Sequence, residues 1–511
     1  MAIHTFGAID VGSYELNLKI FEISRGKGIR EVDDLVRRVD LGTDTYTHGK
    51  ISSNHVREVT QILQEFHRIM DTYRVEAYQA YGTSAIREMT NAEIVLSQWE
   101  QKSGIHIDVL SNSEQRFLDY KSVAMRGEKF NKSIQDTCAI VDIGGSSIQI
   151  SLFEKDKLAA TQNMKLGVLR IREMLSHIDV RTGEYERLIS DLVNSQMEVF
   201  RKLYLHNDRI HNIIIVDDYI SALMQARHMD IIHHADFDSF AAESGSVSVT
   251  QLARKAGITE DAAGLLHISA VVMGCIADSL GAELIYAPGV TLADGIAYEY
   301  AEKKKIILPE HDFEEDIIAC AKNISRRYMG SEERSRSIED IALKIFDATK
   351  KAHGMGMRER FLLRMASILH DCGKYISMVN LATCSYDIIM STEIIGLSHI
   401  EREIVANVVK FNHSDFVYYE EQEGTSDLTR EAYLTIARLT AILRLSNGID
   451  RTHQQKFSDL HVRTKDDKLL ISVPSGIDVT LEKGMFRNRA DFFEEVMGIR
   501  PVIRQGAVSR K

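Results

Sequence analysis

One pattern of acidic, glycine and serine residues occurs twice in the chain. Residues 9–22 read IDVGSYELNLKIFE and residues 141–154 read VDIGGSSIQISLFE, and they align without a gap, with Asp10 on Asp142. In each copy an apolar run predicts a short buried strand, and the glycine after it lets backbone N–H groups approach an anion closely. The duplication therefore predicts two similar domains whose turns hold phosphate across a shared cleft.

The turn residues offer two kinds of ligand. The hydroxyls of Ser13, Ser146 and Ser147 are hydrogen-bond donors for phosphate oxygens. A carboxylate repels phosphate but binds Mg²⁺ through its oxygens, so Asp10 and Asp142 are candidate magnesium ligands. Asp and Gly are also common in ordinary hairpin turns, which is the simpler interpretation of either copy alone. Two copies in register favour phosphate binding.

Composition limits the class of protein. A chain of 511 residues with 44% hydrophobic residues is expected to form several domains with substantial cores. The net charge of −12 argues against a general nucleic-acid binder, which needs a basic face, but permits a local basic channel for a polyanion. The five cysteines form no CxxC pair, which is typical of inert thiols in a reducing cytosol.

No targeting or membrane segment is predicted. The N-terminus lacks the basic and apolar regions of a signal peptide. The most apolar later stretch, residues 268–287, is interrupted by Asp278 and Glu283 and does not have the pattern of a membrane span. We therefore expect a cytoplasmic protein with no membrane partner.

The order of apolar and polar residues predicts two kinds of domain. Up to about residue 305, strands alternate with amphipathic helices, beginning with strands near 4–41 and again near 137–170, which indicates α/β layers. After residue 310 the pattern is helical, apart from an alternating segment at 460–473 that predicts a strand pair. The expected domains are 1–130, 131–305 and 306–511.

Four segments together resemble one known family. They read AIDVGSYELNL, YGTSAIREMTNA, VLSNSEQRFLDY and VDIGGSSIQI. Over most of its length the chain resembles the exopolyphosphatase/guanosine pentaphosphate phosphohydrolase family, within the superfamily of actin, hexokinase and the heat-shock ATPases. The resemblance implies two actin-like (ribonuclease H-like) α/β domains with an interdomain cleft, followed by an all-α HD-type domain. It also implies Mg²⁺-dependent release of orthophosphate.

The resemblance assigns roles to several residues. Glu114 stands at the start of a segment similar to the family's Glu-Glu-Ala-Arg-Leu run and corresponds to the catalytic base, so we expect Glu114→Gln to abolish phosphate release. Asp10 and Asp142 correspond to the aspartates that support magnesium. The phosphate-binding positions correspond to Arg87, Gly12, Ser13, Gly144, Gly145 and Ser147.

Local chemistry leaves two of these roles open. Ser111 and Glu114 have the spacing of a capping box at an expected helix start, and the sequence around Glu114 favours that structural role. Arg87 has the planar guanidinium that suits phosphate oxygens, but Glu88 or Glu93 could pair with it instead.

Several positions depart from the family pattern. In the second turn Gln149 replaces a carboxylate, and in the first turn Tyr14 and Glu15 replace asparagine and serine. Glu15 adds negative charge where a polyanion would bind, and like charges repel strongly at low dielectric. After the apolar strand near 211–218, Asp217 stands where a glycine-rich loop is expected. These changes remove donors and add acids.

The expected HD-type metal ligands are also incomplete. His370 and Asp371 form the adjacent pair that supplies two ligands in this type of domain. The upstream histidine corresponds to Arg334 and the downstream aspartate to Asn447. We therefore predict that His370 and Asp371 have a structural role and hydrogen-bond within the helical domain.

The expected function is Mg²⁺-dependent hydrolysis of terminal phosphoanhydride bonds of inorganic polyphosphate, as in an exopolyphosphatase, or of guanosine pentaphosphate. The altered turns leave a second class open, a catalytically weak relative that binds polyphosphate or a nucleotide and has a regulatory role. A third class is an actin-superfamily ATPase or kinase, although the sequence lacks a glycine-rich adenosine pocket. The resemblance is also compatible with a homodimer.

Overall fold

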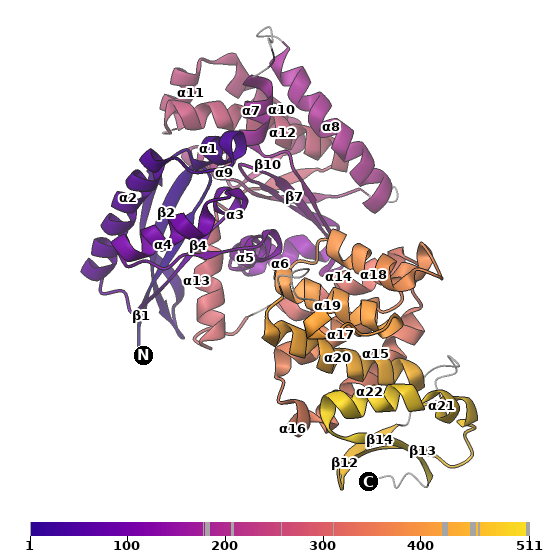
Figure 1. Cartoon of the computed structure of the whole chain (residues 1–511). Coiled ribbons are helices and arrows are strands. Elements are labelled where there is room, and N and C mark those ends of the chain that lie inside the picture. Colours follow the sequence, from indigo (N-terminus) through magenta and orange to yellow (C-terminus); the bar gives the residue numbers. More distant parts are fainter. Residues whose placement is uncertain are drawn as a thin grey trace. The chain divides into compact units, whose positions relative to one another are not determined.

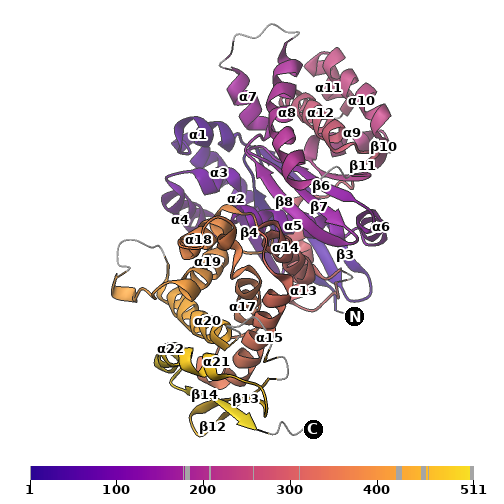
Figure 2. The same ribbon diagram turned by 90° about the vertical axis from the view of Figure 1, so that its right-hand side faces the viewer.

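The chain divides into two compact units, Met1–Asp316 and Ile317–Lys511 (Figure 1). The first contains two mixed sheets with helices on their faces, and the second is mainly helical (Figures 1 and 2). The expected order, α/β layers followed by a helical domain, is confirmed. The computed structural model describes residues 2–176, 178, 184–205, 209–256, 258–309, 311–421, 428–449, 456–457 and 460–506.

Five strands form the first sheet: β1 (His4–Val11), β2 (Glu15–Ser24), β3 (Gly28–Arg38), β4 (Ala77–Gly82) and β5 (Asp108–Val109). Their order across the sheet is β3-β2-β1-β4-β5, with antiparallel pairing among β1, β2 and β3 and parallel pairing of β4 with β1 and β5. The helices of this part of the chain are α1 (Leu41–His48), α2 (Ser53–Thr72), α3 (Ser84–Glu88), α4 (Ala92–Ser103), α5 (Asn112–Ala124) and α6 (Glu128–Gln135).

Six strands form the second sheet: β6 (Cys138–Ile143), β7 (Ile148–Glu154), β8 (Lys157–Met164), β9 (Asn212–Val216), β10 (Ile231–His233) and β11 (Leu284–Tyr286). Their order is β10-β11-β9-β6-β7-β8. The helices here are α7 (Val168–Ser176), α8 (Tyr185–Tyr204), α9 (Asp218–Ala226), α10 (His234–Ser246), α11 (Val249–Ala256), α12 (Glu260–Leu280) and α13 (Leu292–Lys303).

Both sheets contain the same hairpin, as the duplication predicts. Asp10 of β1 lies opposite Asn17 of β2, and Asp142 of β6 lies opposite Gln149 of β7. A later strand then pairs in parallel with the first strand of each hairpin, β4 with β1 and β9 with β6. The two copies therefore agree in strand register, which places both aspartates at the same point of their sheets.

Side chains alternate between the faces of the first sheet, so that each face has its own core. On β1, Ile9 and Val11 belong to the core that includes α2 and α4. Phe6 and Ala8 point the other way, into a core with residues of α13. Residues 131–305 were expected to form the second domain, but α13, near the end of that range, packs against β1 and β2 of the first sheet.

The ends of two strands also differ from the sequence-based expectation. The strands expected to end near residues 41 and 170 are shorter, because α1 begins at Leu41 and α7 at Val168. An Asp40 carboxylate that accepts a hydrogen bond from Thr43 N–H caps α1. In the first copy, the cap of α1 therefore ends the strand at a point where the sequence still contains apolar residues.

Helix α12 is the most apolar helix of the first unit. Residues Ala262–Leu280 are long and apolar enough to span a membrane, with a mean hydropathy of 1.6, and 61% of the apolar window is buried. The helix packs against α7, α8, α9, α10 and α11. A buried core helix of a folded domain passes the same test of length and composition, so this feature is weak evidence for a membrane span.

The second unit packs its helices α15, α17, α19 and α20 together. Its elements are α14 (Phe313–Arg327), which contains the division between the units, α15 (Glu332–Ala348), α16 (Lys350–His353), α17 (Met357–Leu369), η1 (Cys372–Tyr375), α18 (Leu381–Ser391), α19 (His399–His413), η2 (Tyr419–Glu421), α20 (Arg430–Ile449), β12 (His461–Lys465), β13 (Lys468–Pro474), α21 (Thr480–Met485), α22 (Arg487–Met497) and β14 (Arg500–Gly506).

The C-terminal strands form a larger sheet than the sequence predicted. The strand pair expected at 460–473 is present as the antiparallel pair β12 and β13. The expectation of a pair alone was wrong, because β14 adds a third strand parallel to β13. β14 follows α22 and packs against it, so its pairing with β13 joins two strands that are separated by α21 and α22 rather than by a local turn.

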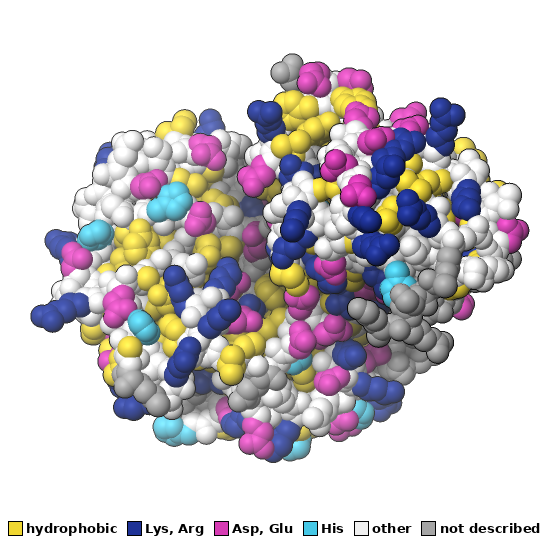
Figure 3. All heavy atoms as spheres, turned by 90° about the horizontal axis from the view of Figure 1, so that it is seen from below, with side chains coloured by type: hydrophobic (Ala, Val, Ile, Leu, Met, Phe, Trp, Pro, Cys, Tyr) yellow, Lys and Arg dark blue, Asp and Glu magenta, His cyan; other side chains and the backbone are white. Residues whose placement is uncertain are grey.

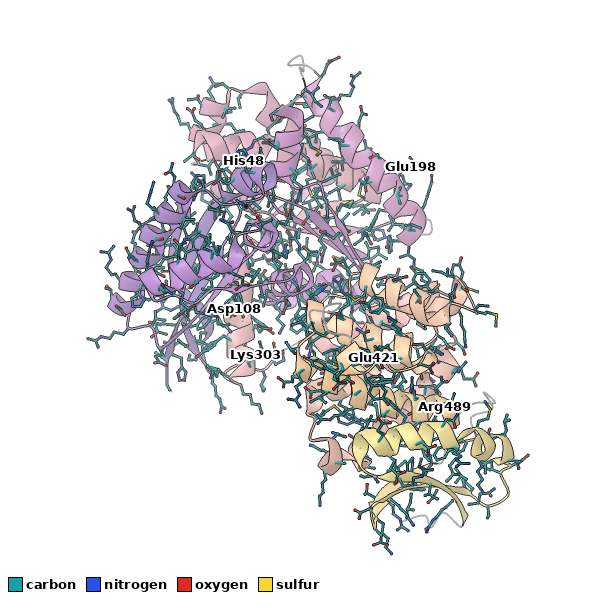
Figure 4. The ribbon with its side chains drawn as sticks, viewed as in Figure 1. His48, Asp108, Glu198, Lys303, Glu421 and Arg489 are labelled. Carbon is teal, nitrogen blue, oxygen red and sulfur yellow. The ribbon has the colours of Figure 1, made fainter. Side chains whose placement is uncertain are left out.

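Charged side chains are mixed over the molecular surface that Figure 3 shows, where lysine and arginine alternate with aspartate and glutamate. Some of them form ion pairs within one helix, such as the exposed Glu198 and Lys202 on α8 at 2.6 Å, and the partly buried Glu299 with the exposed Lys303 on α13 at 3.1 Å (Glu198 and Lys303 are labelled in Figure 4). Exposed pairs of this kind add little stability, so the apolar cores hold each unit together.

Candidate functional site

Both Asp-x-Gly turns line a single cavity in the first unit. Its volume is about 120 Å³. Since one water molecule occupies roughly 10–15 Å³ on this measure, the cavity has room for roughly ten water-sized groups, which is enough for a diphosphate. The structure thus brings the duplicated turns together as predicted. The lining includes Asp10, Gly12, Ser13, Tyr14, Glu15, Arg87, Gln115, Arg116, Asp119, Asp142, Gly144, Gly145, Ser146 and Asp217.

The same hydrogen bond closes both turns. Gly12 N–H donates to the carbonyl of Glu15 at 2.9 Å, and Gly144 N–H donates to the carbonyl of Ser147 at 3.0 Å. A Cβ at Gly12 would lie 2.8 Å from the oxygen of Glu15, which explains the glycine. The glycine amides therefore shape the turns, and the amides of the residues that follow them are the candidate phosphate donors.

The hydroxyl of Ser13 belongs to a small cluster of hydroxyl groups. It lies 2.8 Å from the hydroxyl of Tyr46 and 2.8 Å from that of Ser84. The guanidinium of Arg170 lies over the ring of Tyr46 at 4.6 Å and donates to the carbonyl of Ser146 at 3.0 Å. The sequence did not single out Tyr46, Ser84 or Arg170, because their contacts join segments far apart in the chain.

The second turn rests on the start of α7. The amide of Val168 donates to the carbonyl of Gly144 at 3.1 Å, and the amide of Leu169 donates to that of Gly145 at 2.9 Å. At Gly167 a Cβ would lie 2.3 Å from the backbone of the turn, so a side chain there has no space. The conformation of the second turn therefore depends on Gly167, which lies outside the sequence of the turn itself.

Arg116 of α5 is the main cation beside the second turn. Its side chain is only 4% exposed and forms an ion pair with the carboxylate of Asp142. It also donates to the hydroxyl of Ser147 at 2.8 Å and lies 3.7 Å from Asp119. Burial and then the nearby charge of Asp142 raise the pKa of Asp119 well above its usual range, although Arg116 opposes this. Asp119 therefore holds its proton to a higher pH than an exposed aspartate does.

Of two predicted phosphate ligands, Arg87 lines the cavity and Ser147 does not. Arg87 lines the cavity, where it donates to the carbonyl of Leu110 at 2.6 Å, and Glu88, which could have paired with it, pairs with Arg170. Ser147 is not among the described residues that line the cavity, and its hydroxyl accepts the hydrogen bond from Arg116. Arg87 thus remains a candidate phosphate ligand, whereas Ser147 supports Arg116.

Glu114, the predicted catalytic base, forms a capping box instead. Its carboxylate accepts a hydrogen bond from Ser111 N–H at 3.0 Å, and its own amide donates to the Ser111 hydroxyl at 3.3 Å. It is not among the described residues that line the cavity, but its neighbour Gln115 is. In the Glu-Glu-Ala-Arg-Leu pattern Gln115 has the place of the second glutamate. The geometry therefore favours the local capping interpretation for Glu114.

The residues at the cavity do not form a magnesium site. Mg²⁺ requires nearly octahedral oxygen ligands, usually including carboxylates that can turn towards it. The Asp142 carboxylate is held by Arg116, and Asp119 lies 3.7 Å from the same guanidinium. Within the described residues, there is no group of three or more histidine, cysteine, aspartate or glutamate side chains placed to hold a metal ion. The structure gives the predicted role of Asp10 and Asp142 no support.

The helical unit shows a similar arrangement at its expected metal site. Arg334 forms an ion pair with Asp371 at 2.9 Å and donates to the amide oxygen of Asn447 at 2.8 Å. His370 donates to the carbonyl of Ser367 at 2.8 Å. Burial alone would raise the pKa of Asp371, but His370 and Arg334 hold that pKa well below its usual range. The hydrogen bonds and ion pairs expected of His370 and Asp371 within the helical domain are present.

His413 makes the helical unit sensitive to pH. Burial lowers its pKa to about 4, although its contact with the carbonyl of His370 opposes this. Because the unfolded chain binds the proton near pH 6.5, the stability due to neutral His413 is complete above pH 6.5. We expect roughly 3 kcal/mol of it to be lost as the pH falls to 4.

Urea unfolding followed by circular dichroism between pH 4 and 7 tests this expectation. His353 shifts in the same direction, so the comparison is between the wild-type chain and His413→Gln, which keeps a donor for the His370 carbonyl. The variant should lose most of the pH-dependent difference. Equal slopes for the two proteins would show that His413 does not titrate in this range.

Comparison with known proteins agrees with this architecture. Residues 19–304 match the model of the Ppx/GppA phosphatase family, and residues 318–485 match the model of Ppx/GppA phosphatase, domain III. A guanosine-5'-triphosphate,3'-diphosphate pyrophosphatase of Photobacterium profundum is 20% identical over 473 residues, which is 92% of each chain. The counterpart from Vibrio vulnificus is 20% identical over 442 residues, or 86% of each chain.

Solved structures show the same fold in the first unit. An exopolyphosphatase from Cytophaga hutchinsonii has a TM-score of 0.52 at 17% identity, and it covers 60% of this chain and 100% of its own. A Ppx/GppA family member from Aquifex aeolicus has a TM-score of 0.50 at 16% identity, and it covers 59% of this chain and 99% of its own. With both family models matched in order along most of its length, the chain belongs to the Ppx/GppA phosphatase family.

Proposed function

We propose that this chain binds the terminal phosphoryl groups of inorganic polyphosphate or guanosine pentaphosphate in the cavity between its two turns, with slow hydrolysis of the terminal bond. The observation that carries the proposal is that the two duplicated turns, from different sheets, line one small cavity. The names of the relatives support this class of ligand, since they describe an exopolyphosphatase and guanosine-5'-triphosphate,3'-diphosphate pyrophosphatases.

Binding and hydrolysis make different demands on the cavity. Binding needs donors, which the turn amides and Arg87 supply. Hydrolysis also needs a base that orients and deprotonates water. Gln115 cannot accept a proton, Glu114 is used in the helix cap, and the Asp142 carboxylate is paired with Arg116. Asp119 lies 3.7 Å from the same guanidinium, and Asp217 caps α9. Asp10 and Glu15 also line the cavity, and the resemblance assigns neither of them the role of base. Slow turnover follows from these observations.

Two measurements made side by side test the proposal. Orthophosphate release from long-chain polyphosphate and from guanosine pentaphosphate is measured with Mg²⁺ present, and binding of the same ligands is measured by calorimetry. We expect binding with little release. Absence of binding to both ligands would contradict the proposal, and rapid release would show that the chain is a full hydrolase.

A full hydrolase is the second candidate, favoured because both units match the phosphatase family. Gln115→Glu distinguishes the two, since it places a carboxylate at the cavity. If turnover is limited by the missing base, we expect phosphate release to rise by about 10²-fold, the lower end of the usual effect of a general base.

Glu114→Gln is the matched control, because glutamine also fits a capping box. The control should leave release unchanged. A large loss of release in Glu114→Gln, with no gain in Gln115→Glu, would instead restore Glu114 as the base and contradict the geometry.

A further inference from the structure

We propose that Arg116 takes the place of a divalent cation in the cavity, so that this chain binds phosphoryl groups without Mg²⁺. The inference rests on the proposed function and adds a property to it. Its basis is the position of one buried guanidinium beside the second turn, where it pairs with Asp142, one of the two aspartates that the resemblance assigned to metal binding.

Arg116 is fixed by contacts on several sides. It pairs with the carboxylate of Asp142, donates to the hydroxyl of Ser147 at 2.8 Å, and lies against Gly144, where a Cβ would be 3.4 Å from its Nη2. A guanidinium is planar, always charged and suited to bind oxygen atoms, so it can neutralise a carboxylate and still face an anion. Arg116 also lines the cavity.

A divalent cation would have to displace this arrangement. To coordinate Asp142 it must break the ion pair and leave a guanidinium that is only 4% exposed without its partner. Separating a buried pair is costly, because the remaining charge is not solvated. Asp119 lies 3.7 Å from the same guanidinium, so a metal ion would meet a positive charge at this carboxyl as well. The resident cation therefore competes well with an incoming one.

The helical unit provides an independent example of the same replacement. Arg334 stands where the HD-type pattern has a histidine ligand, and it forms an ion pair with Asp371 at 2.9 Å. Asn447, in place of the downstream aspartate, accepts a hydrogen bond from the same guanidinium at 2.8 Å. At each of the two positions where the resemblance implies a metal, an arginine pairs with an aspartate that would have been a ligand.

The sequence offers a variant that reverses the replacement. In the Glu-Glu-Ala-Arg-Leu pattern the position of Arg116 is alanine, so Arg116→Ala restores the family residue and frees Asp142. We expect the full-length variant to require Mg²⁺ for binding of inorganic tripolyphosphate, whereas the wild-type chain binds it equally in EDTA and in Mg²⁺.

The expected change is large enough to measure by calorimetry. In EDTA, Arg116→Ala should bind tripolyphosphate at least about tenfold more weakly than the wild-type chain, as is typical for loss of a charged hydrogen-bond partner. Mg²⁺ should restore most of this loss. Arg30→Ala is the matched control, because Arg30 is an exposed arginine that pairs with Glu22 at 2.6 Å, and it should behave as the wild-type chain does.

A metal titration without phosphate distinguishes a metal site on the protein from Mg²⁺ that arrives bound to tripolyphosphate. Mn²⁺, which also prefers carboxylate oxygens, is titrated without phosphate and followed by electron paramagnetic resonance. Arg116→Ala should bind one Mn²⁺ that the wild-type chain does not bind. Circular dichroism checks folding, and Arg116→Gln, which keeps more of the side-chain volume, replaces Arg116→Ala if the latter unfolds.

The outcomes distinguish this inference from the proposed function. Wild-type binding of tripolyphosphate only with Mg²⁺, or a Mn²⁺ site in the wild-type chain that Arg116→Ala does not change, overturns the role of Arg116 and leaves the proposed function intact. No binding of tripolyphosphate by the wild-type chain in either buffer overturns both.

Discussion

Replacing Arg334 by alanine is expected to lower the free energy of unfolding of the helical unit by about 3 kcal/mol. The side chain of Arg334 is 8% exposed and that of Asp371 is 12% exposed, and the two form an ion pair at 2.9 Å. Removal of the guanidinium leaves the Asp371 carboxylate buried, and Lys374, His370 and His413 are its other ion-pair partners among the described residues. It also leaves the amide oxygen of Asn447 without its donor.

Urea unfolding of the full-length chain measures this effect. Circular dichroism reports on both units, and the fluorescence of Trp99, the single tryptophan, reports on the first unit alone. The Trp99 transition should not move. Arg336→Ala on the same helix is the control, since Arg336 is 79% exposed and should change stability by less than about 0.5 kcal/mol. Equal effects of the two substitutions would show that Arg334 does not hold the helical unit together.

The second large effect is expected at the phosphate turn. Gly167→Ala should weaken tripolyphosphate binding by at least about tenfold, with a moderate loss of stability of about 1–3 kcal/mol. An added Cβ would lie 2.3 Å from the carbonyl oxygen of Gly145 and from backbone atoms of Ser146 and Ser147, so the turn must move. Donors arranged for an anion lose their geometry when the backbone shifts.

Gly264→Ala in α12 is the matched control, because a Cβ there meets no atom within 4 Å. Alanine is favoured over glycine inside a helix, so this control should bind tripolyphosphate as the wild-type chain does and be slightly more stable. Calorimetry gives both affinities. A Gly167→Ala variant that folds and binds with unchanged affinity would show that the second turn does not hold the ligand.

The duplication gave a correct account of much of the first unit. Asp10 and Asp142 carry the same strand register, and their turns share a cavity. This was predictable because a strand and its glycine turn are local features with a distinct pattern. α13 was expected in the second domain but packs against the first sheet, because the apolar residues of a helix do not indicate which of two similar sheets they cover.

The site itself depended on contacts that no local pattern contains. In the sequence nothing distinguishes Arg116 from other helical residues, and only the position of α5 in the fold places it beside Asp142. Glu114 was assigned by resemblance, although its spacing from Ser111 already favoured the capping box that the structure shows. At this position the local spacing predicted the contact that the structure shows, and the role of Glu114 as the base stays a prediction. In the helical unit, by contrast, the comparison with the family pattern was informative, since Arg334 and Asn447 already stood in place of metal ligands in the sequence.

Hydrogen exchange of the full-length chain with and without inorganic tripolyphosphate tests the central claim most directly. Amides of the two turns are the proposed donors, so peptides covering residues 10–17 and 142–149 should both exchange more slowly when the ligand is bound. Bound tripolyphosphate that leaves both segments unchanged, or protects only segments elsewhere, would contradict a shared phosphate site between the duplicated turns.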